Sequence, residues 1–273
     1  MSYMMLKNKN IIITGASSGL GKALAFYSAS LGANLVICAR NKENIIDVEQ
    51  SIKKLYPTQK IKALVIDVCI KEDNEKLVNE AISFLGSIDI FIANAAKSMW
   101  SRFSDVEEVN DMKELMVLNY MSVVYASYYT LTYLKKSQGS FVAISSIQGV
   151  LPVPYHTGYV ASKHAVNSFI ETLKLEEPNI HFLLAMPSWI AGTDLRKNAL
   201  VSHTKNSIKV QTTHNKNIIT KEECAKKIIE SLINKEEYLY IPKKYKFIQY
   251  ARIFFKKLTD KIVLNKVNKQ LKN

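Results

Sequence analysis

The fold is decided by the stretch Ile11-Ile12-Ile13-Thr14-Gly15-Ala16-Ser17-Ser18-Gly19-Leu20-Gly21. Its first half is apolar without alternation, as expected of a strand that is buried on both faces. The glycines after it predict a tight turn into a helix. Glycine lets the backbone approach a pyrophosphate closely, and a helix N-terminus offers it free N–H groups. We interpret the turn as a cofactor-binding site whose contacts are Gly15, Ser17, Ser18, Gly19, Leu20 and Gly21.

Other glycine motifs compete with this interpretation. The spacing Gly-x-x-x-Gly-x-Gly differs from the widespread Gly-x-Gly-x-x-Gly turn, and Gly21-Lys22 comes one residue too late for a P-loop. Gly15–Gly19 also matches the nucleophile elbow of hydrolases. That motif needs an upstream loop for its oxyanion hole, whereas this strand opens the sequence. A turn that only packs a helix closely on a sheet remains the structural alternative.

The rest of the chain alternates short β-branched runs with longer helix-like stretches. The predicted strands are Asn10–Thr14, Asn34–Cys38, Ile61–Ile66, Ile88–Ala93, Ser140–Ser145, Ile180–Ala185 and Tyr238–Ile241. The predicted helices are Gly19–Leu31, Lys42–Tyr56, Lys71–Leu85, Asp105–Lys136, Tyr159–Leu175 and Thr220–Asn234. This order predicts one α/β domain with a doubly wound parallel sheet of about seven strands and helices on both faces. Ligands of such sheets bind beyond the carboxyl ends of the strands.

The second predicted strand runs into Ala39-Arg40-Asn41-Lys42. An acidic residue at this distance from the glycines would hold the ribose 2′-hydroxyl of NAD, whereas an arginine accommodates the 2′-phosphate of NADP. No carboxylate is available before Glu43, so we predict NADP(H) as the preferred cofactor, with NAD(H) possible and Arg40 and Asn41 as contacts. A solvated arginine at a strand end is the alternative.

Asp67-Val68 comes after the third predicted strand and adds two candidate cofactor contacts. The Asp67 carboxylate could accept a hydrogen bond from an adenine amino group. It could equally cap the turn that comes next. The sequence leaves both roles open.

The catalytic candidates begin with Tyr159 and Lys163, which lie four residues apart at the start of a predicted helix. Side chains at this spacing share one helix face, so the ammonium can stabilise the phenolate and lower the pKa of the tyrosine. Such a phenol exchanges protons with a carbonyl or alcohol oxygen. Ser146, at the end of a strand, could hydrogen-bond the same oxygen. Asn119, in a long predicted helix, could anchor a water near Lys163.

Together these residues resemble the short-chain dehydrogenase/reductase family, over Asn10 to about Ile241. Thr14–Gly21 is similar to the family's cofactor turn, and Asn94-Ala95-Ala96 to its Asn-Ala-Gly segment. Asn119, Ser146, Tyr159 and Lys163 match its catalytic tetrad in order and spacing. Two positions depart from the pattern: Ala96 stands where glycine is usual, and Pro187-Ser188 replaces Pro-Gly.

The resemblance implies a Rossmann fold and a role for each member of the tetrad. Tyr159 is the acid/base, Lys163 also holds the nicotinamide ribose, Ser146 polarises the carbonyl, and Asn119 keeps a proton-relay water. The resemblance further implies a homodimer or homotetramer. The cofactor contacts that it adds are Asn94, Ala95, Tyr159, Lys163, Pro187, Ile190 and Thr193, the last arriving one residue late for the family's threonine.

Within that family, three features look similar to the branch of the 11-beta-hydroxysteroid dehydrogenases and related lipid-acting reductases. They are Ala39-Arg40, the helix start Lys221-Glu222-Glu223-Cys224-Ala225, and the basic apolar tail. The branch implies an apolar or lipid-like substrate. Members of this branch often associate with membranes through an N-terminal anchor, which we do not find here.

Composition limits the class of protein. The chain has 273 residues with 48% hydrophobic residues, enough for one large domain with a sizeable core. Its cysteines are Cys38, Cys69 and Cys224, without metal-ligand spacing or a disulfide pattern, so we predict no metal and a reducing, cytoplasmic location. We find no signal peptide and no apolar run long enough to span a bilayer.

The net charge of +13 is concentrated in the tail. Residues 243–273 carry ten Lys or Arg and one acidic residue, a net of +9, so residues 1–242 carry about +4. We therefore divide the chain into a dinucleotide-binding domain, residues 1–242, and a tail, residues 243–273. The tail has helical apolar spacing at Phe247, Ala251, Phe254, Phe255, Leu258 and Ile262. This pattern fits a membrane surface, or a terminal helix docked on the body or a partner subunit, better than nucleic acid.

The long polar segment 186–219 predicts a functional loop or lid. Trp189, Ile190 and Leu195 could cover an apolar substrate, and His156 could line the pocket, although such residues are also common in packing or at the surface. We predict an enzyme that interconverts a ketone and a secondary alcohol with NADP(H). The rival hypothesis is a non-catalytic dinucleotide sensor or scaffold with a membrane-associating tail.

Overall fold

The computed structural model describes residues 5–193, 195, 199–201 and 218–272. In this part of the chain one sheet holds seven parallel strands in the order β3-β2-β1-β4-β5-β6-β9. Its strands are β1 (Asn10–Thr14), β2 (Asn34–Ala39), β3 (Ile61–Val65), β4 (Ile90–Ala93), β5 (Ser140–Ile144), β6 (His181–Pro187) and β9 (Tyr238–Ile241). β7 (Ile190–Ala191) and β8 (Ile219–Thr220) form a separate parallel pair.

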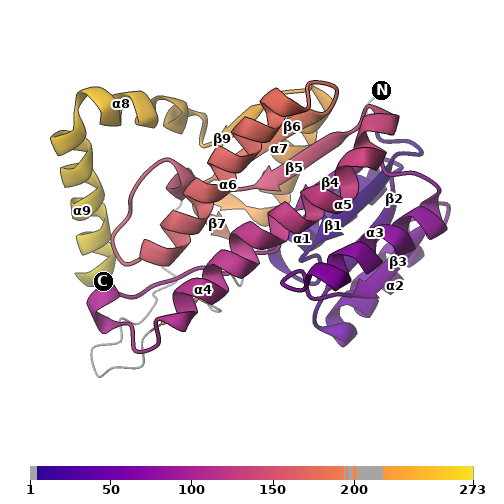
Figure 1. Ribbon diagram of the computed structural model, residues 1–273, viewed down its shortest axis with the longest axis horizontal. Helices are drawn as coiled ribbons and strands as arrows, with labels where there is room; N and C mark the ends of the chain where they lie inside the picture. The colour runs from indigo at the N-terminus through magenta and orange to yellow at the C-terminus, as the bar shows by residue number, and fades with distance from the viewer. Residues whose placement is uncertain (1–4, 194, 196–198, 202–217, 273) are drawn as a thin grey trace.

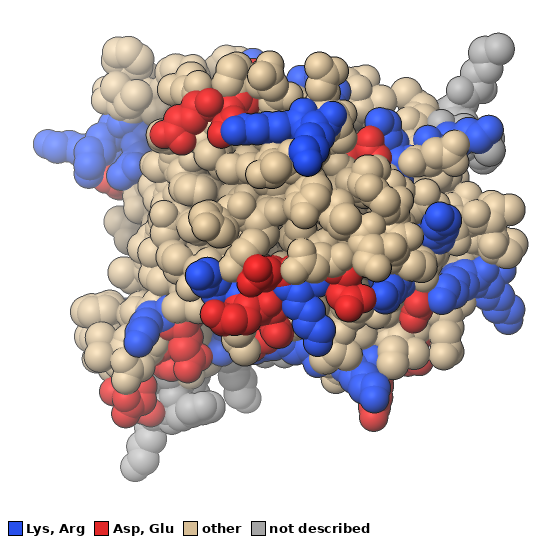
Figure 2. Space-filling view, turned by 45° about the vertical axis from the view of Figure 1, so that its right-hand side comes forward, with Lys and Arg blue, Asp and Glu red and all other residues tan. Residues whose placement is uncertain are grey.

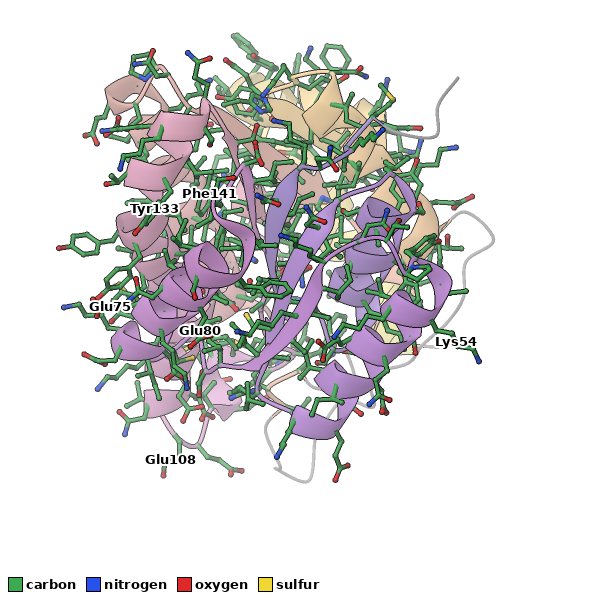
Figure 3. The ribbon with its side chains drawn as sticks, turned by 90° about the vertical axis from the view of Figure 1, so that its right-hand side faces the viewer. Lys54, Glu75, Glu80, Glu108, Tyr133 and Phe141 are labelled. Atoms are coloured by element: carbon green, nitrogen blue, oxygen red, sulfur yellow. The ribbon has the colours of Figure 1, made fainter. Side chains whose placement is uncertain are left out.

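Helices cover both faces of the sheet (Figure 1). α1 (Gly19–Ser30), α2 (Lys42–Leu55) and α7 (Lys221–Ile233) form one layer, in which α1 packs on α7. The other layer contains α3 (Lys71–Leu85), α4 (Asn110–Met116), α5 (Ser122–Ser137) and α6 (Thr157–Glu176). Figure 3 looks at the layers from the side, with Tyr133 of α5 and Lys54 of α2 on opposite sides of the sheet. The predicted single α/β domain with a doubly wound sheet is confirmed.

The apolar run of β1 is buried on both faces, as its sequence predicts. Ile11 and Ile13 join the core under α1, α2 and α7, whereas Ile12 joins the core on the other side. The second core contains Phe91, Phe141 and Phe182 from three neighbouring strands, all almost fully buried. The rings of Phe91 and Phe141 stack with centroids 5.3 Å apart. Buried aromatic rings of this size contribute heavily to the stability of such a core.

The predicted helix Asp105–Lys136 is wrong in detail. A 3-10 turn (Phe103–Asp105) is followed by α4, a π-helical turn (Val117–Met121) and α5. In the π-helical turn the N–H of Ser122 donates to the carbonyl of Val117, five residues earlier. A π turn adds a residue to the helical repeat and shifts the side chains after it, which periodicity alone does not reveal. Asn119 lies in this turn.

The tail is also not one helix. It contains a 3-10 turn (Lys243–Phe247), α8 (Ile248–Phe254) and α9 (Lys256–Lys272), with a break at Phe255. Ile253, Phe254 and Phe255 are consecutive, so they cannot share one face of a straight helix. The sheet ends with β9 at Ile241, just before the predicted domain boundary, and the division into 1–242 and 243–273 remains a prediction. None of the described helices combines the length and apolarity needed to cross a bilayer.

Phe141→Ala should lower the free energy of unfolding by about 3–5 kcal/mol, because it removes a fully buried ring and leaves a cavity between Phe91 and Phe182. Urea denaturation followed by circular dichroism measures this change. Leu175→Ala is the control, since Leu175 is 79% exposed. A Phe141 variant as stable as the control would contradict the assigned core.

Candidate active site

The carboxyl ends of the parallel strands border a cavity of about 550 Å³. The glycine turn and the end of β2 line one part of it. The segments after β4, β5 and β6 and the first turns of α6 line the rest. The predicted site residues in its wall are Gly15, Ser17, Ser18, Gly19, Leu20, Gly21, Arg40, Asn41, Val68, Asn94, Ala95, Ser146, Tyr159, Lys163, Pro187, Ile190 and Thr193. One cavity therefore joins nearly all residues that the sequence singled out, but Asn119 and Asp67 are not among its lining residues.

Two glycines of the turn, Gly15 and Gly21, leave no room for a side chain. Gly15 has φ +65°, and a Cβ there would lie 2.9 Å from the Cα of Ala95. A Cβ on Gly21 would collide with the carbonyl of Gly15 and the amide of Asn94. The Asn94 amide donates to the carbonyls of Thr14 and Gly15 at 3.0 and 3.2 Å. Asn94 therefore fixes the turn to the end of β4.

The first turn of α1 faces the cavity. Ser18 is the N-cap residue, but its side chain makes no capping hydrogen bond, and the first turn contains no acidic residue. Gly19, Leu20 and Gly21 line the cavity. Free N–H groups and a positive helix end attract an anion. These residues fit the diphosphate of a dinucleotide.

The end of β2 carries the predicted contacts for the other end of the cofactor. Arg40 is exposed and lines the cavity. Asn41 also lines it, while its side chain accepts from the N–H of Asn44 at 2.8 Å and so caps α2. The Asp67 carboxylate accepts from the N–H of Cys69 at 3.0 Å, which is the capping role. Contact of Asp67 with adenine remains a prediction.

Tyr159 and Ser146 meet at the opposite end of the cavity. Tyr159 is buried, and its hydroxyl lies near that of Ser146, which donates to the carbonyl of Pro187 at 3.4 Å. The Ser146 hydroxyl accepts from the N–H of Gln148 at 3.2 Å, which holds it at the end of β5. Burial raises the pKa of Tyr159 to about 12, and the nearby Ser146 hydroxyl offsets only part of this effect. The phenol is therefore protonated at neutral pH.

Lys163 lies one helical turn after Tyr159 and is also buried, with 3% of its surface exposed. Its ammonium donates to the carbonyl of Ile144 at 2.8 Å and lies 5.8 Å from the centre of the Tyr159 ring. Burial lowers the pKa of Lys163 to about 8. The expectation that Lys163 lowers the pKa of Tyr159 is wrong for this geometry, because burial dominates and the ammonium faces the ring and Ile144.

Asn119 is fully buried, and its side chain hydrogen-bonds to two separate segments of the protein. Its amide oxygen accepts from the N–H of Lys97 at 2.9 Å, and its amide nitrogen donates to the Lys97 carbonyl at 3.0 Å. The same nitrogen donates to the hydroxyl of Ser162 at 2.9 Å, which in turn donates to the carbonyl of Tyr159 at 2.8 Å. Asn119 thereby ties the segment after β4 to the helix of Tyr159. Its predicted hold on a water remains a prediction.

Thr193 lies close to Gly19 of the glycine turn, although it comes one residue later in the sequence than the resemblance implies. A Cβ on Gly19 would lie 3.6 Å from the Cβ of Thr193. The Thr193 hydroxyl donates to the carbonyl of Ile190 at 3.4 Å. Ile190 and Pro187 line the same cavity. Ala96, at the position where the related sequences have glycine, has no left-handed backbone that would require one.

An aromatic wall lies beside Tyr159 and was only partly expected. The ring of His156 is edge-on to Trp100 at 4.7 Å and lies 6.4 Å from Trp189 and 6.5 Å from Tyr159. His156 is 2% exposed, so the alternative of a surface histidine is excluded. The sequence interpretation missed Trp100, Lys97, Ser98 and Gln148. The available signal was their position directly after the Asn94 and Ser146 segments.

The chain matches known proteins over most of its length. The family model described as short chain dehydrogenase matches residues 9–203. The 11-beta-hydroxysteroid dehydrogenase A of Sesamum indicum is 31% identical over 253 residues, covering 90% of this chain and 72% of that protein. The dehydrogenase/reductase SDR family protein 7-like of Dictyostelium discoideum is 33% identical over 228 residues, covering 82% and 70%.

Two solved structures show the same fold. A short chain dehydrogenase/reductase from Burkholderia phymatum, in complex with NAD, has a TM-score of 0.81 and 20% identity, covering 93% of this chain and 96% of its own. The alcohol dehydrogenase from Thermococcus sibiricus, complexed with 5-hydroxy-NADP, has a TM-score of 0.75 and 22% identity, covering 85% and 95%.

The burial of Lys163 predicts a pH-dependent stability. Its pKa is about 8 in the folded protein against 10.5 for an unperturbed lysine, so the folded state binds fewer protons between these values. The free energy of unfolding therefore rises with pH across this window. Relative to Lys163→Met, the parent protein should gain about 2 kcal/mol between about pH 8 and about pH 10. Urea denaturation at both ends of the window measures the difference.

The control for this experiment is Lys54→Met, which changes an exposed lysine of α2 (Figure 3). It should behave like the parent protein at both pH values. If Lys163→Met also behaves like the parent protein, Lys163 does not carry a buried charge.

Proposed function

Because this chain belongs to the short-chain dehydrogenase/reductase family of oxidoreductases, in the branch of the 11-beta-hydroxysteroid dehydrogenases, we propose that it interconverts a ketone and a secondary alcohol with NADP(H). The observation that carries the proposal is the burial of Tyr159, Ser146 and Lys163 together in the cavity that begins at the glycine turn. A bound nicotinamide dinucleotide supplies or accepts the hydride. Tyr159 and Ser146 handle the oxygen of the substrate.

In the proposed mechanism, the carbonyl oxygen of the substrate accepts hydrogen bonds from the Tyr159 and Ser146 hydroxyls. These bonds strengthen as negative charge develops on that oxygen, which stabilises the transition state. Tyr159 then gives its proton to the alkoxide. Burial of the phenol keeps it protonated at neutral pH, so the proton is available for this step. Lys163 provides a positive charge behind the tyrosine ring, and Asn119 positions their helix through Ser162.

Arg40 supports NADP(H) over NAD(H). It is the first charged residue after β2, it lines the cavity, and no acidic side chain among the described residues forms an ion pair with it. A guanidinium pairs well with a phosphate, whereas a 2′-hydroxyl gains little from it. NAD(H) remains the second cofactor to test.

The aromatic wall of Trp100, His156 and Trp189 supports an apolar or lipid-like substrate. The His156 ring borders Tyr159, and His156 and Trp189 line the cavity with Trp100 packed behind His156, so the apolar part of the substrate would lie against this wall while its carbonyl reaches the hydroxyls. Leu195 lines the same cavity. The non-catalytic scaffold is the weaker hypothesis, since cofactor binding alone does not require a buried tyrosine hydroxyl beside Ser146 in the cavity.

A homodimer or homotetramer is proposed through α5. This helix has no charged residue from Ser122 to Leu134, and its Tyr128 is 72% exposed. Figure 2 shows a broad uncharged band between acidic and basic side chains on this side of the body. The three free cysteines support a reducing compartment such as the cytoplasm. A membrane surface is a further partner that the basic tail suggests, and it is independent of the catalytic site.

Tyr159→Phe should reduce kcat by at least about 100-fold while leaving cofactor affinity and stability nearly unchanged, because only the transferable proton is lost. NADPH oxidation in the presence of a panel of cyclic and aromatic ketones measures turnover, and calorimetry measures cofactor binding. Tyr155→Phe is the matched control, since its hydroxyl accepts from Arg102 at 3.1 Å outside the tetrad. A Tyr159 variant that turns over like the parent protein would exclude the mechanism.

Arg40→Ser should weaken NADPH binding by about 10- to 100-fold and change NADH binding by less than about threefold, because only NADPH has the 2′-phosphate. Titration of the purified protein with each cofactor, followed by fluorescence, gives the two Kd values. Lys42→Ser, an exposed cation two residues later, controls for a general loss of positive charge. An equal effect of Arg40→Ser on both cofactors would contradict the assigned role.

A further inference from the structure

The tail concentrates the exposed apolar surface of the described chain. Seventeen large apolar residues are more than about one third exposed, and eight of them fall between residues 247 and 264. These eight are Phe247, Tyr250, Ile253, Phe254, Phe255, Leu258, Ile262 and Leu264. Contiguous exposed apolar surface marks an interaction site, because it is costly to leave in water.

Seven of the eight gather around the bend between α8 and α9. Tyr250, Ile253 and Phe254 share one side of α8, because Ile253 and Phe254 come three and four residues after Tyr250, and Phe247 directly precedes the helix. Phe255 forms the bend, and Leu258 and Ile262 continue on one face of α9. Figure 1 shows α8 and α9, in yellow, as a hook whose bend lies far from the sheet. We call these seven residues the apolar corner.

The apolar corner is not the surface by which α9 packs on the protein. Thr259 and Val267 of α9 are buried, and Val263 and Leu264 line a second cavity of about 670 Å³ with residues of α6 such as Val160. Leu258 and Ile262 lie on another face of the helix and remain 57% and 47% exposed. Docking of the tail on the body, one of the two alternatives left by the sequence, therefore leaves the apolar corner uncovered.

The backbone at the bend is already hydrogen-bonded within the tail. The N–H of Phe255 donates to the carbonyl of Ala251 at 2.8 Å, and the N–H of Thr259 donates to the carbonyl of Phe255 at 3.0 Å. The Thr259 hydroxyl also donates to the Lys256 carbonyl at 2.8 Å. Insertion of a segment into lipid requires such internal satisfaction of polar backbone groups, because the lipid offers none.

The charge of the tail indicates which kind of partner fits the apolar corner. Ten Lys or Arg and one acidic residue, Asp260, occur from Lys243 to the end of the chain, and Asp260 already pairs with Lys256 at 2.8 Å. Lys257 and Lys261 are exposed and flank Leu258 on α9. A second copy docked corner to corner would bring two tails of net +9 together, which like-charge repulsion opposes. An anionic surface with an apolar interior matches both properties.

We propose that the apolar corner inserts into the interface of an anionic lipid bilayer, while the surrounding lysines contact acidic headgroups. A helix with apolar residues on one side and lysines beside them lies in the interfacial plane, and its binding combines apolar burial with electrostatic attraction. This deepens the membrane partner proposed for the tail and does not depend on the catalytic proposal. The tail that carries the corner adjoins α6, the helix of Tyr159, through Val263 and Leu264.

The test is co-sedimentation of the full chain with vesicles of phosphatidylcholine alone and of phosphatidylcholine mixed with phosphatidylserine. We expect binding to the mixed vesicles at least about tenfold stronger than to the neutral ones, decreasing with added salt. Phe254→Ser/Phe255→Ser should reduce it at least about tenfold, as should Lys257→Gln/Lys261→Gln. The matched controls, Leu55→Ser/Leu175→Ser and Lys54→Gln/Lys76→Gln, change exposed residues elsewhere and should bind like the parent protein.

Several results would overturn the proposal. The parent protein could bind neither kind of vesicle, or the corner variants could bind the mixed vesicles as well as the parent protein does. The control variants could also lose as much vesicle binding as the corner variants. Light scattering tests whether a second copy of the chain covers the apolar corner. If the parent protein is a dimer and Phe254→Ser/Phe255→Ser dissociates it, the corner is a contact between copies and not a membrane site. Tyr159→Phe should bind vesicles like the parent protein, so a failure of the catalytic proposal is distinguishable from a failure of this one.

Discussion

The close approach of Gly15, Gly21 and Asn94 is the constraint on which the cofactor end of the molecule depends. A Cβ on Gly21 would strike the carbonyl of Gly15, and the Asn94 amide bonds the carbonyls of Thr14 and Gly15. This contact draws α1 onto the ends of β1 and β4, so the N-terminus of α1, which has no side-chain cap, faces the cavity. The glycines thus serve packing, and in the proposed function the same turn binds the cofactor. The interpretation of the segment as a packing turn is therefore compatible with its interpretation as a cofactor site.

The catalytic end depends on a different device, the burial of polar groups in a connected set. Lys163 is held by the Ile144 carbonyl, and Asn119 holds the helix of Tyr159 through Ser162. Each group loses water on burial and regains a hydrogen bond, which fixes its position. The same burial moves the pKa values of Tyr159 and Lys163 in opposite directions, to about 12 and about 8. The site therefore combines a protonated phenol with a lysine that is easily neutralised.

Periodicity and motif spacing were enough to predict the sheet and many of the residues that line the cavity. The apolar runs indicated the strands, and the motifs at their ends indicated the cavity residues, because the ends of parallel strands meet at one edge. The sequence could not predict the π turn at Asn119, the break at Phe255 or the pKa of Tyr159. Each of these depends on three-dimensional surroundings: which backbone groups find partners, where apolar side chains can be buried, and how much water a group loses. His156 shows the same limit, since its place among Trp100 and Trp189 comes from segments far apart in the chain.

The partition of charge separates the tail from the body in physical terms. The body is close to neutral for its size, at about +4, and Figure 2 shows acidic and basic side chains interspersed on one of its faces. The tail holds +9 in 31 residues and exposes most of its large apolar side chains, so it adds little to the core. Folding of the sheet, which closes with β9, does not account for such a segment. High positive charge and exposed apolar residues oppose each other in water, where the one favours solvation and the other burial. They become compatible at a boundary that offers negative charge and an apolar phase side by side, as an anionic membrane does.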